Sequence, residues 1–207
     1  KLADPDLAYL PAQSQEAPDY FAAMSAAANF AFVNHRVICW NVRRTFREVF
    51  NDRAKLPLVY HVAHNMAKIE DGCYVHRKGA TRALPPGDKK NPTRYKGTGH
   101  PILIPGSMGT ASYVLVGTEA ASATFYSTPH GAGRLMSRHE ANRRYRGEKV
   151  KSELEHQKIY VKSDSWRGIS EEAPGAYKDV DEVVRVVAET GIGRLVVRLK
   201  PFGVIKG

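Results

Sequence analysis

The chain has 207 residues, of which 43% are hydrophobic, so it is long enough to bury a sizeable core in one domain or two. Lysine and arginine total 31 against 21 aspartate and glutamate residues, and this net charge of +10 favours polyanionic partners. No apolar stretch approaches the roughly 20 residues that a membrane-spanning helix needs. We expect a cytoplasmic protein whose Cys39 and Cys73 are reduced thiols, because they lack metal-ligand spacing.

A long helix is predicted from Ser14 to about Phe50. Ser14 can cap the helix N-terminus, and Pro18 suits the first turn. Small side chains on one face favour close packing, and three arginines near the end complement the helix dipole: Ala22, Ala23, Ala26, Ala27, Ala28 and Ala31, with Arg43, Arg44 and Arg47. We expect the aromatic residues in the core rather than in a base-stacking platform: Phe21, Phe30, Phe32 and Trp40.

Short β-rich runs follow this helix, at residues 58–64, 72–78, 101–104 and 113–116, and residues 85–99 are typical of an exposed loop. A basic helix is predicted from Arg138 to about His156, with either a solvated or an RNA-contacting face. A short amphipathic helix over 180–190 ends at Gly191, and a strand follows at 195–199. These elements predict an α+β fold: a mixed sheet with a long N-terminal helix and peripheral helices.

The first of two glycine-containing loops runs from Ile104 to Tyr113, between two apolar runs. It carries hydroxyls at Ser107, Thr110 and Ser112. These hydroxyls and the loop amides would suit the phosphates or the sugar of a nucleotide, whereas the alternative is a hairpin with a wide polar turn.

The second loop, Ser127 to Arg134, contains His130 next to small residues that leave the backbone accessible. The glycines of Gly131-Ala132-Gly133 let main-chain N–H groups approach an anion, and Arg134 supplies a planar charged fork. A neutral imidazole at His130 can attack phosphorus. The same pattern also fits ordinary turn chemistry, so the loop alone leaves both interpretations open.

Taken together, the motifs resemble those of the RtcB-type RNA ligases, GTP- and manganese-dependent enzymes that join RNA ends in tRNA splicing and RNA repair. The resemblance covers essentially the whole chain in the order of the family, on these segments: Asp4–Leu10, Ala26–Ala31, Val62–Lys68, His76–Arg82, Ile104–Tyr113, Ser127–Arg134 and Gly203–Gly207. It implies an RtcB-like fold that is incomplete here. Residues 1–207 would be the C-terminal part of one catalytic domain, and the N-terminal half, with most of the metal ligands, would be absent.

The resemblance also implies roles for individual residues. His130 matches the histidine that attacks the α-phosphorus of GTP and becomes guanylated. Tyr177 would stack on guanine and Lys206 would hydrogen-bond the base, within the following set of GMP-contacting residues: Ser107, Ser112, Ala132, Gly133, Tyr177 and Lys206. Lys78, Arg77 and Arg134 would hold substrate phosphates. His64 would be the one manganese ligand that this chain contributes.

By this resemblance the enzyme would join an RNA 3′-phosphate or 2′,3′-cyclic phosphate end to a 5′-hydroxyl end. Its partners would be GTP, RNA such as tRNA halves or broken RNA, and the N-terminal half of the same protein, with archease as a candidate activator. The alternative is a non-catalytic fragment that binds RNA or a guanine nucleotide. We expect the isolated chain to be inactive without the N-terminal half.

Other motifs argue against different enzymes, and one residue departs from the family. Lys68 to Gly72 has one residue too many for the Lys-x-Asp-Gly of lysine nucleotidyltransferases, and the sequence has no Walker A loop. A metal-dependent phosphohydrolase would need more carboxylate and histidine ligands than the sequence offers. Pro129 stands where many family members carry cysteine, and we expect it to change loop stiffness more than chemistry.

Overall fold

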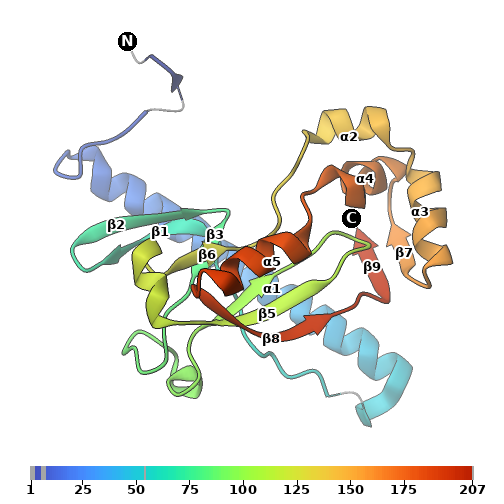
Figure 1. Ribbon diagram of the computed structural model, residues 1–207, viewed down its shortest axis with the longest axis horizontal. Helices are drawn as coiled ribbons and strands as arrows, with labels where there is room; N and C mark the ends of the chain where they lie inside the picture. Colours follow the sequence, from blue (N-terminus) through green and yellow to red (C-terminus); the bar gives the residue numbers. More distant parts are fainter. Residues whose placement is uncertain (1–2, 6–7, 54, 207) are drawn as a thin grey trace. The chain divides into compact units, whose positions relative to one another are not determined.

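The computed structural model describes residues 3–5, 8–53 and 55–206. Asp6, Leu7 and Gly207, which belong to the motifs above, lie outside these described residues. Helices occur together with several small sheets, so the fold is α+β as predicted (Figure 1). No helix in the described ranges combines the length and the apolar character needed to cross a membrane. The chain divides into two compact units, residues 1–61 with 66–76, and residues 62–65 with 77–207.

The first unit contains the long helix and most of a hairpin. Helix α1 (Glu16–Phe50) is followed by a short 3₁₀ helix (Asn51–Arg53). The hairpin consists of β1 (Asn65–Glu70) and β2 (Cys73–Lys78). Its two-residue turn has positive φ at both Asp71 and Gly72, the conformation that Asp-Gly favours in tight hairpins.

The long helix is confirmed, although it begins at Glu16 and its N-cap is Gln15 rather than the predicted Ser14. One face of α1 contacts its own unit. The ring of Phe21 meets that of Tyr74 edge to face, and the Arg43 guanidinium donates a hydrogen bond to the Leu56 carbonyl. No described residue of α1 is buried, and most of its alanines are exposed.

The core prediction is therefore wrong for two of the four aromatic residues of α1. Phe21 and Phe32 are half-buried, whereas Phe30 is 75% and Trp40 is 58% exposed. Helical periodicity explains the split, because Phe30 and Trp40 do not share the side of α1 that carries Phe21 and Phe32. Val33 and Val37 are exposed with Phe30 and Trp40, and we call these four residues the apolar strip of α1.

The strand predicted at residues 58–64 is also wrong, since β1 begins only at Asn65. The Asp71-Gly72 turn places residues 65–70 opposite residues 73–78, and a strand extends only as far as its partner does. Beyond Lys78 the partner turns away at Gly79, whose φ is +69°. The apolar alternation at residues 58–64 therefore has no strand in β2 to pair with.

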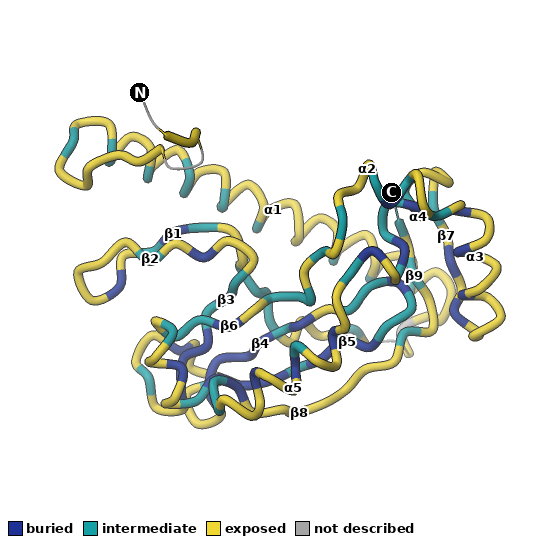
Figure 2. The backbone as a smooth tube through the Cα atoms, turned by 45° about the horizontal axis from the view of Figure 1, so that its top comes forward, coloured by how far each residue is buried: buried dark blue, intermediate teal, exposed yellow. Residues whose placement is uncertain are grey.

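The second unit is built on an antiparallel sheet with strand order β4-β5-β8: β4 (Pro101–Ile104), β5 (Ser112–Gly117) and β8 (Gly193–Leu199). Helix α5 (Val180–Glu189) packs on this sheet. Figure 2 shows the contrast between buried β4 and β5 and exposed β8. The first core cluster lies between the helix and the sheet: Ala83, Ile102, Ile104, Ala111, Tyr113, Leu115, Ala121, Val180, Val184 and Val187.

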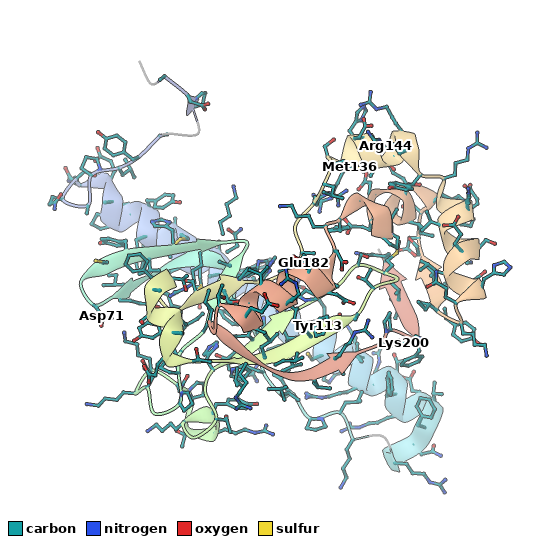
Figure 3. All side chains as sticks on the ribbon, viewed as in Figure 1. Asp71, Tyr113, Met136, Arg144, Glu182 and Lys200 are labelled. Carbon is teal, nitrogen blue, oxygen red and sulfur yellow. The ribbon has the colours of Figure 1, made fainter. Side chains whose placement is uncertain are left out.

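Tyr113, labelled in Figure 3, fastens α5 to the sheet. Its hydroxyl donates to Asp181 at 2.6 Å and accepts from the Arg198 guanidinium at 2.8 Å. A strand residue and a helix residue are thus joined through one phenol. This contact fixes the end of α5 that follows the Tyr177 segment.

A two-stranded sheet brings the histidine loop into the second unit. Strand β3 (Ala80–Arg82) pairs antiparallel with β6 (Ser127–Pro129), and Ala80 lies opposite Pro129. The predicted loop at 85–99 contains one short 3₁₀ helix (Thr93–Tyr95), and another (Glu119–Thr124) precedes β6.

A helical layer completes the second unit. It contains α2 (Arg138–Arg144), α3 (Gly147–His156), α4 (Trp166–Glu171) and a 3₁₀ turn (Pro174–Ala176), together with the parallel strands β7 (Tyr160–Ser163) and β9 (Gly203–Lys206). Figure 1 shows α3 and α4 beside β7. The second core cluster is Met108, Val150, Leu154, Ile159, Val161, Ile169 and Ala173.

The single basic helix predicted over 138–156 is wrong, because the chain breaks into α2 and α3 at Tyr145 and Arg146. Both residues have extended backbone angles. A Cβ on Gly147 would overlap the backbone of Trp166, so the start of α3 lies directly against the segment that begins α4. This close approach explains the break between α2 and α3, and the local sequence pattern gives no sign of it.

Most of the positive charge on these two helices is paired within the helices. Glu140 accepts from Arg143 and Arg144, and Lys149 and Lys151 pair with the glutamates four residues on, at 3.9 and 3.7 Å. Exposed pairs of this kind contribute little to stability. They favour the interpretation of this surface as a solvated face over that of a dedicated RNA contact.

Candidate functional site

A cavity of about 610 Å³ lies within the second unit, where four segments converge. The segments are the loop after β4, the loop after β6, the stretch from Glu172 to Tyr177, and the last strand, β9. Eight predicted site residues line the cavity: Ser107, Ser112, His130, Ala132, Gly133, Arg134, Tyr177 and Lys206.

His130 and His64 lie next to each other, and Gly79 explains why. The N–H of Gly79 donates to the carbonyl of His64 at 3.2 Å, and the N–H of His130 donates to the carbonyl of Gly79 at 3.2 Å. The two ring centroids are 3.9 Å apart. The backbone of Gly79 thus links His64, the residue before β1, to the histidine loop, and the two imidazoles lie in contact.

The imidazole of His130 is disposed toward its neutral form. Partial burial lowers its pKa, because the charged ring would lose hydration, and the nearby His64 lowers it further by repulsion. A neutral imidazole keeps a lone pair on one ring nitrogen. His130 can therefore act as a nucleophile near neutral pH.

The backbone after His130 is joined to the Tyr177 segment. Lys178 N–H donates to the Gly133 carbonyl at 3.0 Å, and Leu135 N–H donates to the Ala176 carbonyl at 2.9 Å. Gly133 has a φ of +76°, which favours glycine over other residues. The pairing places the histidine loop and Tyr177 on one wall of the cavity, although 43 residues separate Arg134 from Tyr177.

The serine loop folds tightly on itself. Ser112 accepts a hydrogen bond from the Gly106 N–H at 3.1 Å, and Thr110 accepts one from the Ser107 N–H at 2.8 Å. A Cβ on Gly106 would overlap the Ala111 carbonyl, so only glycine fits this turn. The loop thus joins the antiparallel strands β4 and β5 as a wide polar hairpin turn that folds onto itself, and its serines line the cavity.

Tyr177, Arg134 and Glu172 form a hydrogen-bonded group in the lining of the cavity. The Tyr177 hydroxyl donates to the Glu172 carboxylate and accepts from the Arg134 guanidinium at 2.8 Å. Arg134 also donates to the carbonyls of Met136 and Glu171, at 3.0 and 2.6 Å. Met136 is labelled in Figure 3, on the segment that leads to α2. The predicted phosphate ligand Arg134 thus directs its donors largely to the protein itself.

Lys206 is held in place rather than frayed. It lies in β9, opposite Ser163 of β7, and its carbonyl accepts from the Asp164 N–H at 3.2 Å. Its ammonium lies 3.5 Å from the Glu172 carboxylate. A lysine near the end of the sequence therefore reaches the cavity as a strand residue.

Arg77 and Lys78 are not among the described residues that line the cavity. Lys78 is exposed at the end of β2, directly before Gly79. Arg77 is buried, and its guanidinium donates to the Ser127 hydroxyl and to the Phe125 carbonyl, both at 2.9 Å. This contact supports the segment that enters β6, directly upstream of His130.

Among the described lining residues, two charged ones were not assigned from the sequence, Glu172 and Arg138. Glu172 follows another glutamate and stands five residues before the predicted site residue Tyr177, so an acidic pair close to a site residue was the available signal. Arg138 lies four residues after Arg134, and its guanidinium is 3.5 Å from Glu172. Its side chain is 65% exposed, which leaves it more accessible to an anion than Arg134.

The manganese prediction finds only part of a metal site in this chain. Within the described residues, no three histidine, cysteine, aspartate or glutamate side chains gather where they could hold a metal ion. His64 offers one imidazole beside His130. The residues present therefore do not make a manganese centre by themselves.

Comparison with known proteins agrees with the resemblance inferred from the motifs. The family model described as tRNA-splicing ligase RtcB matches residues 1–207. A protein of Pyrococcus furiosus called tRNA-splicing ligase RtcB is 54% identical over 99% of this chain and 22% of its own length. Proteins of the same name from Thermococcus kodakarensis and Archaeoglobus fulgidus are 53% and 52% identical over 99% and 100% of the chain, and over 45% of their own length. The chain thus spans less than half the length of these relatives, and it belongs to the tRNA-splicing ligase RtcB family.

Proposed function

We propose that this chain carries the guanylation site of a GTP- and manganese-dependent RNA ligase, which joins an RNA 3′-phosphate or 2′,3′-cyclic phosphate end to a 5′-hydroxyl end. The observation that carries the proposal is the cavity, which gathers His130, the serine loop, Tyr177 and Lys206 from segments far apart in the sequence. RNA as the substrate is supported by the names of the relatives, which are tRNA-splicing ligases.

The first chemical step is the transfer of GMP to His130. The lone pair of its neutral imidazole attacks the α-phosphorus of GTP, the bond to the β-phosphate oxygen breaks, and pyrophosphate leaves with that electron pair. Main-chain N–H groups of residues 131–133 can donate to the phosphoryl oxygens as charge develops there. Tyr177 and Lys206 are 47 and 76 residues further along the chain and would hold the guanine at the other end.

The later steps return His130 to its free form. An oxygen of the RNA 3′-phosphate attacks the phosphorus of the guanylated histidine, and the P–N bond breaks with its electrons returning to the imidazole. The 5′-hydroxyl of the second RNA end then attacks the activated 3′-phosphorus, loses its proton, and displaces GMP. A 2′,3′-cyclic phosphate must first be opened by water to a 3′-phosphate. The product is a 3′,5′-phosphodiester.

We propose that the metal centre is completed from outside this chain. His64 would contribute one ligand next to the nucleophile, and the N-terminal half of the protein would supply carboxylate, thiolate and further imidazole ligands, the mixed ligand set that suits manganese. Arg138 and Lys78 are the exposed cations best placed to meet RNA phosphates, and archease is a candidate activator.

A second function follows for the chain by itself, namely binding of a guanine nucleotide without turnover. The absence of a three-ligand metal cluster among the described residues favours this reading for the isolated chain. The two readings differ in what the N-terminal half adds, since a complete metal site would convert a binding cavity into a catalytic one.

Covalent labelling with α-phosphate-labelled GTP and manganese tests the proposal. We expect label on this chain when the N-terminal half is added, and no label with His130→Ala. Hydroxylamine or acid should release the label, because a phosphoramidate is labile to acid, whereas a phosphoester is not. Label that persists in His130→Ala would overturn the assignment of the nucleophile, and GTP binding without any label in the complete protein would favour the binding function.

A further inference from the structure

Glu172 is the carboxylate of the cavity, and cations surround it. Among the described lining residues, three carry positive charge and lie within 3.5 Å of Glu172: Arg134, Arg138 and Lys206. The Glu172 side chain is only 19% exposed. Three cations that converge on one space repel one another, and the partly buried Glu172 carboxylate between them offsets this repulsion, with Glu171 also 4.0 Å from Arg138.

The two carboxylate oxygens have different partners. One accepts from the Tyr177 hydroxyl and faces the Lys206 ammonium. The other lies 3.5 Å from both the Arg134 and the Arg138 guanidinium. Glu172 therefore joins four segments of the chain: the histidine loop, the start of α2, the Tyr177 segment and β9.

The ring of Tyr177 is fixed by this arrangement. Its hydroxyl is held between Glu172 and Arg134, and the Arg134 guanidinium carbon lies 4.8 Å from the ring centroid. Arg134 is itself anchored by backbone carbonyls on either side. A tyrosine that is held before a ligand arrives loses less conformational entropy on binding.

Protonation behaviour agrees with a carboxylate that stays charged. Burial opposes ionisation of Glu172, but the hydrogen bond from Tyr177 and the charges of Lys206, Arg134 and Arg138 together lower its pKa. Burial raises the pKa of Tyr177, and the hydrogen bond to Glu172 and its negative charge raise it further. The pair thus consists of a neutral phenol donating to a carboxylate.

We infer that Glu172 is a positioning residue, which holds Tyr177 and Lys206 at the base end of the cavity. Arg134 supports the same two contacts of Glu172, which we call the frame, instead of binding substrate phosphate. The inference rests on the proposed function, because it assigns the frame to the binding of a guanine nucleotide. Glu172 acts through Tyr177 and Lys206, and it does not itself contact the base.

The test compares Glu172→Gln with a matched control, Glu182→Gln. Both glutamates pair with arginine, but Glu182, labelled in Figure 3, is an exposed residue of α5 and is not among the described residues that line the cavity. The first readout needs no nucleotide. The Tyr177 phenol is titrated by NMR of ¹³Cζ-labelled tyrosine, and its signal is assigned with Tyr177→Phe. We expect the pKa of Tyr177 to fall in Glu172→Gln and to stay unchanged in Glu182→Gln.

The second readout is the affinity for GTP and for inosine triphosphate, which lacks the 2-amino group of guanine. For Glu172→Gln we expect both affinities to fall together, by about tenfold, the effect of losing one charge-assisted contact. The loss should be much smaller when Tyr177→Phe is already present, because the two changes break the same contact. If Glu172→Gln does not fold, Tyr177→Phe and Lys206→Met test the two arms of the frame separately.

The outcomes separate the possibilities. An unchanged Tyr177 titration in Glu172→Gln, or an unchanged GTP affinity, overturns the positioning role. Selective loss of GTP affinity, with inosine triphosphate unaffected, would instead show direct contact between Glu172 and guanine, and this also overturns the proposal. If wild-type protein with its N-terminal half binds no guanine nucleotide, the proposed function is wrong, and so is the role of the frame in nucleotide binding. The Tyr177 titration still shows in that case whether the hydrogen bond between Tyr177 and Glu172 exists.

Discussion

The ring centroids of His64 and His130 lie 3.9 Å apart, joined through the two backbone hydrogen bonds of Gly79. One of these histidines is the proposed nucleophile, and the other is the proposed metal ligand. Their contact couples the charge of one ring to the nucleophilicity of the other, since two positive imidazoles at this separation repel each other.

His64→Ala should raise the pKa of His130, because it removes the neighbouring charge that lowers it. The pKa of His130 should nevertheless stay below 6.5, since partial burial, the larger cause, remains. Histidine ring NMR over a pH titration measures this shift directly. His156→Ala serves as the control, because the exposed His156 contacts the Ser152 carbonyl of its own helix. A His130 pKa that stays the same or drops in His64→Ala would contradict the expected repulsion between the two rings.

Arg77→Ala should destabilise the protein by about 2 to 4 kcal/mol, because it leaves the Ser127 hydroxyl and the Phe125 carbonyl without a buried charged donor. Urea unfolding measures the loss, and Arg94→Ala, on an exposed loop, should change stability little. Arg77→Lys distinguishes the two roles of Arg77. A phosphate ligand tolerates lysine in part, whereas a guanidinium that bonds two oxygens at once does not.

His100 should make the protein less stable in mild acid. Burial, with the nearby charges of Arg82 and Arg77, lowers the pKa of His100 from 6.5 to about 4. The unfolded chain therefore takes up a proton on this histidine at higher pH than the folded chain does. The resulting stability is present above pH 6.5 and is lost as the pH falls toward 4, and it amounts to at most about 3 kcal/mol.

Urea unfolding of the wild type and of His100→Gln at pH 7, 5.5 and 4 checks this expectation. Other groups titrate in the same range and contribute equally to both proteins, so the informative quantity is the difference between the two. The wild type should lose more stability than His100→Gln between pH 6.5 and 4. Parallel curves for the two proteins would mean that folding does not lower the pKa of His100.

The apolar strip of α1 should be a contact surface for the N-terminal half of the protein. Phe30, Val33, Val37 and Trp40 are each more than 50% exposed, on a helix without a single buried residue among those described. Val37→Glu with Trp40→Glu should weaken the association of the two halves at least tenfold, while leaving the helical circular dichroism unchanged. Asn29→Glu with Asn34→Glu provides a control with the same change in charge, on exposed polar positions of α1.

The sequence predicted those elements whose signals are local. The extents of α1, β4, β5 and α5 follow from periodicity and turn residues. The break between α2 and α3 was missed because it depends on the contact of Gly147 with Trp166, which is not local. The strand at 58–64 was misplaced because strand pairing, and not alternation alone, decides where β1 begins.

The residues of the candidate site divide in the same way, into those with a local signal and those without one. Each loop motif identified its own cavity residues, because a glycine-rich turn or a serine loop consists of consecutive residues. Glu172 and Arg138 were missed because their role lies in charges that meet only after folding. The role that we infer for Arg134 differs from the predicted one for a similar reason, since its sequence neighbours suggest an anion, whereas its folded neighbours are Tyr177 and backbone carbonyls.

The position of Lys206 in β9 determines when the cavity is completed during synthesis of the protein. Synthesis proceeds from the N-terminus, so the nucleophile, the serine loop and Tyr177 all leave the ribosome before the strand that carries this lysine. Until β9 pairs with β7, the cavity lacks one wall and Glu172 lacks one of its cations. A nascent or prematurely terminated chain would thus hold His130 in an incomplete cavity, and the proposed guanylation would wait until β9 has been translated.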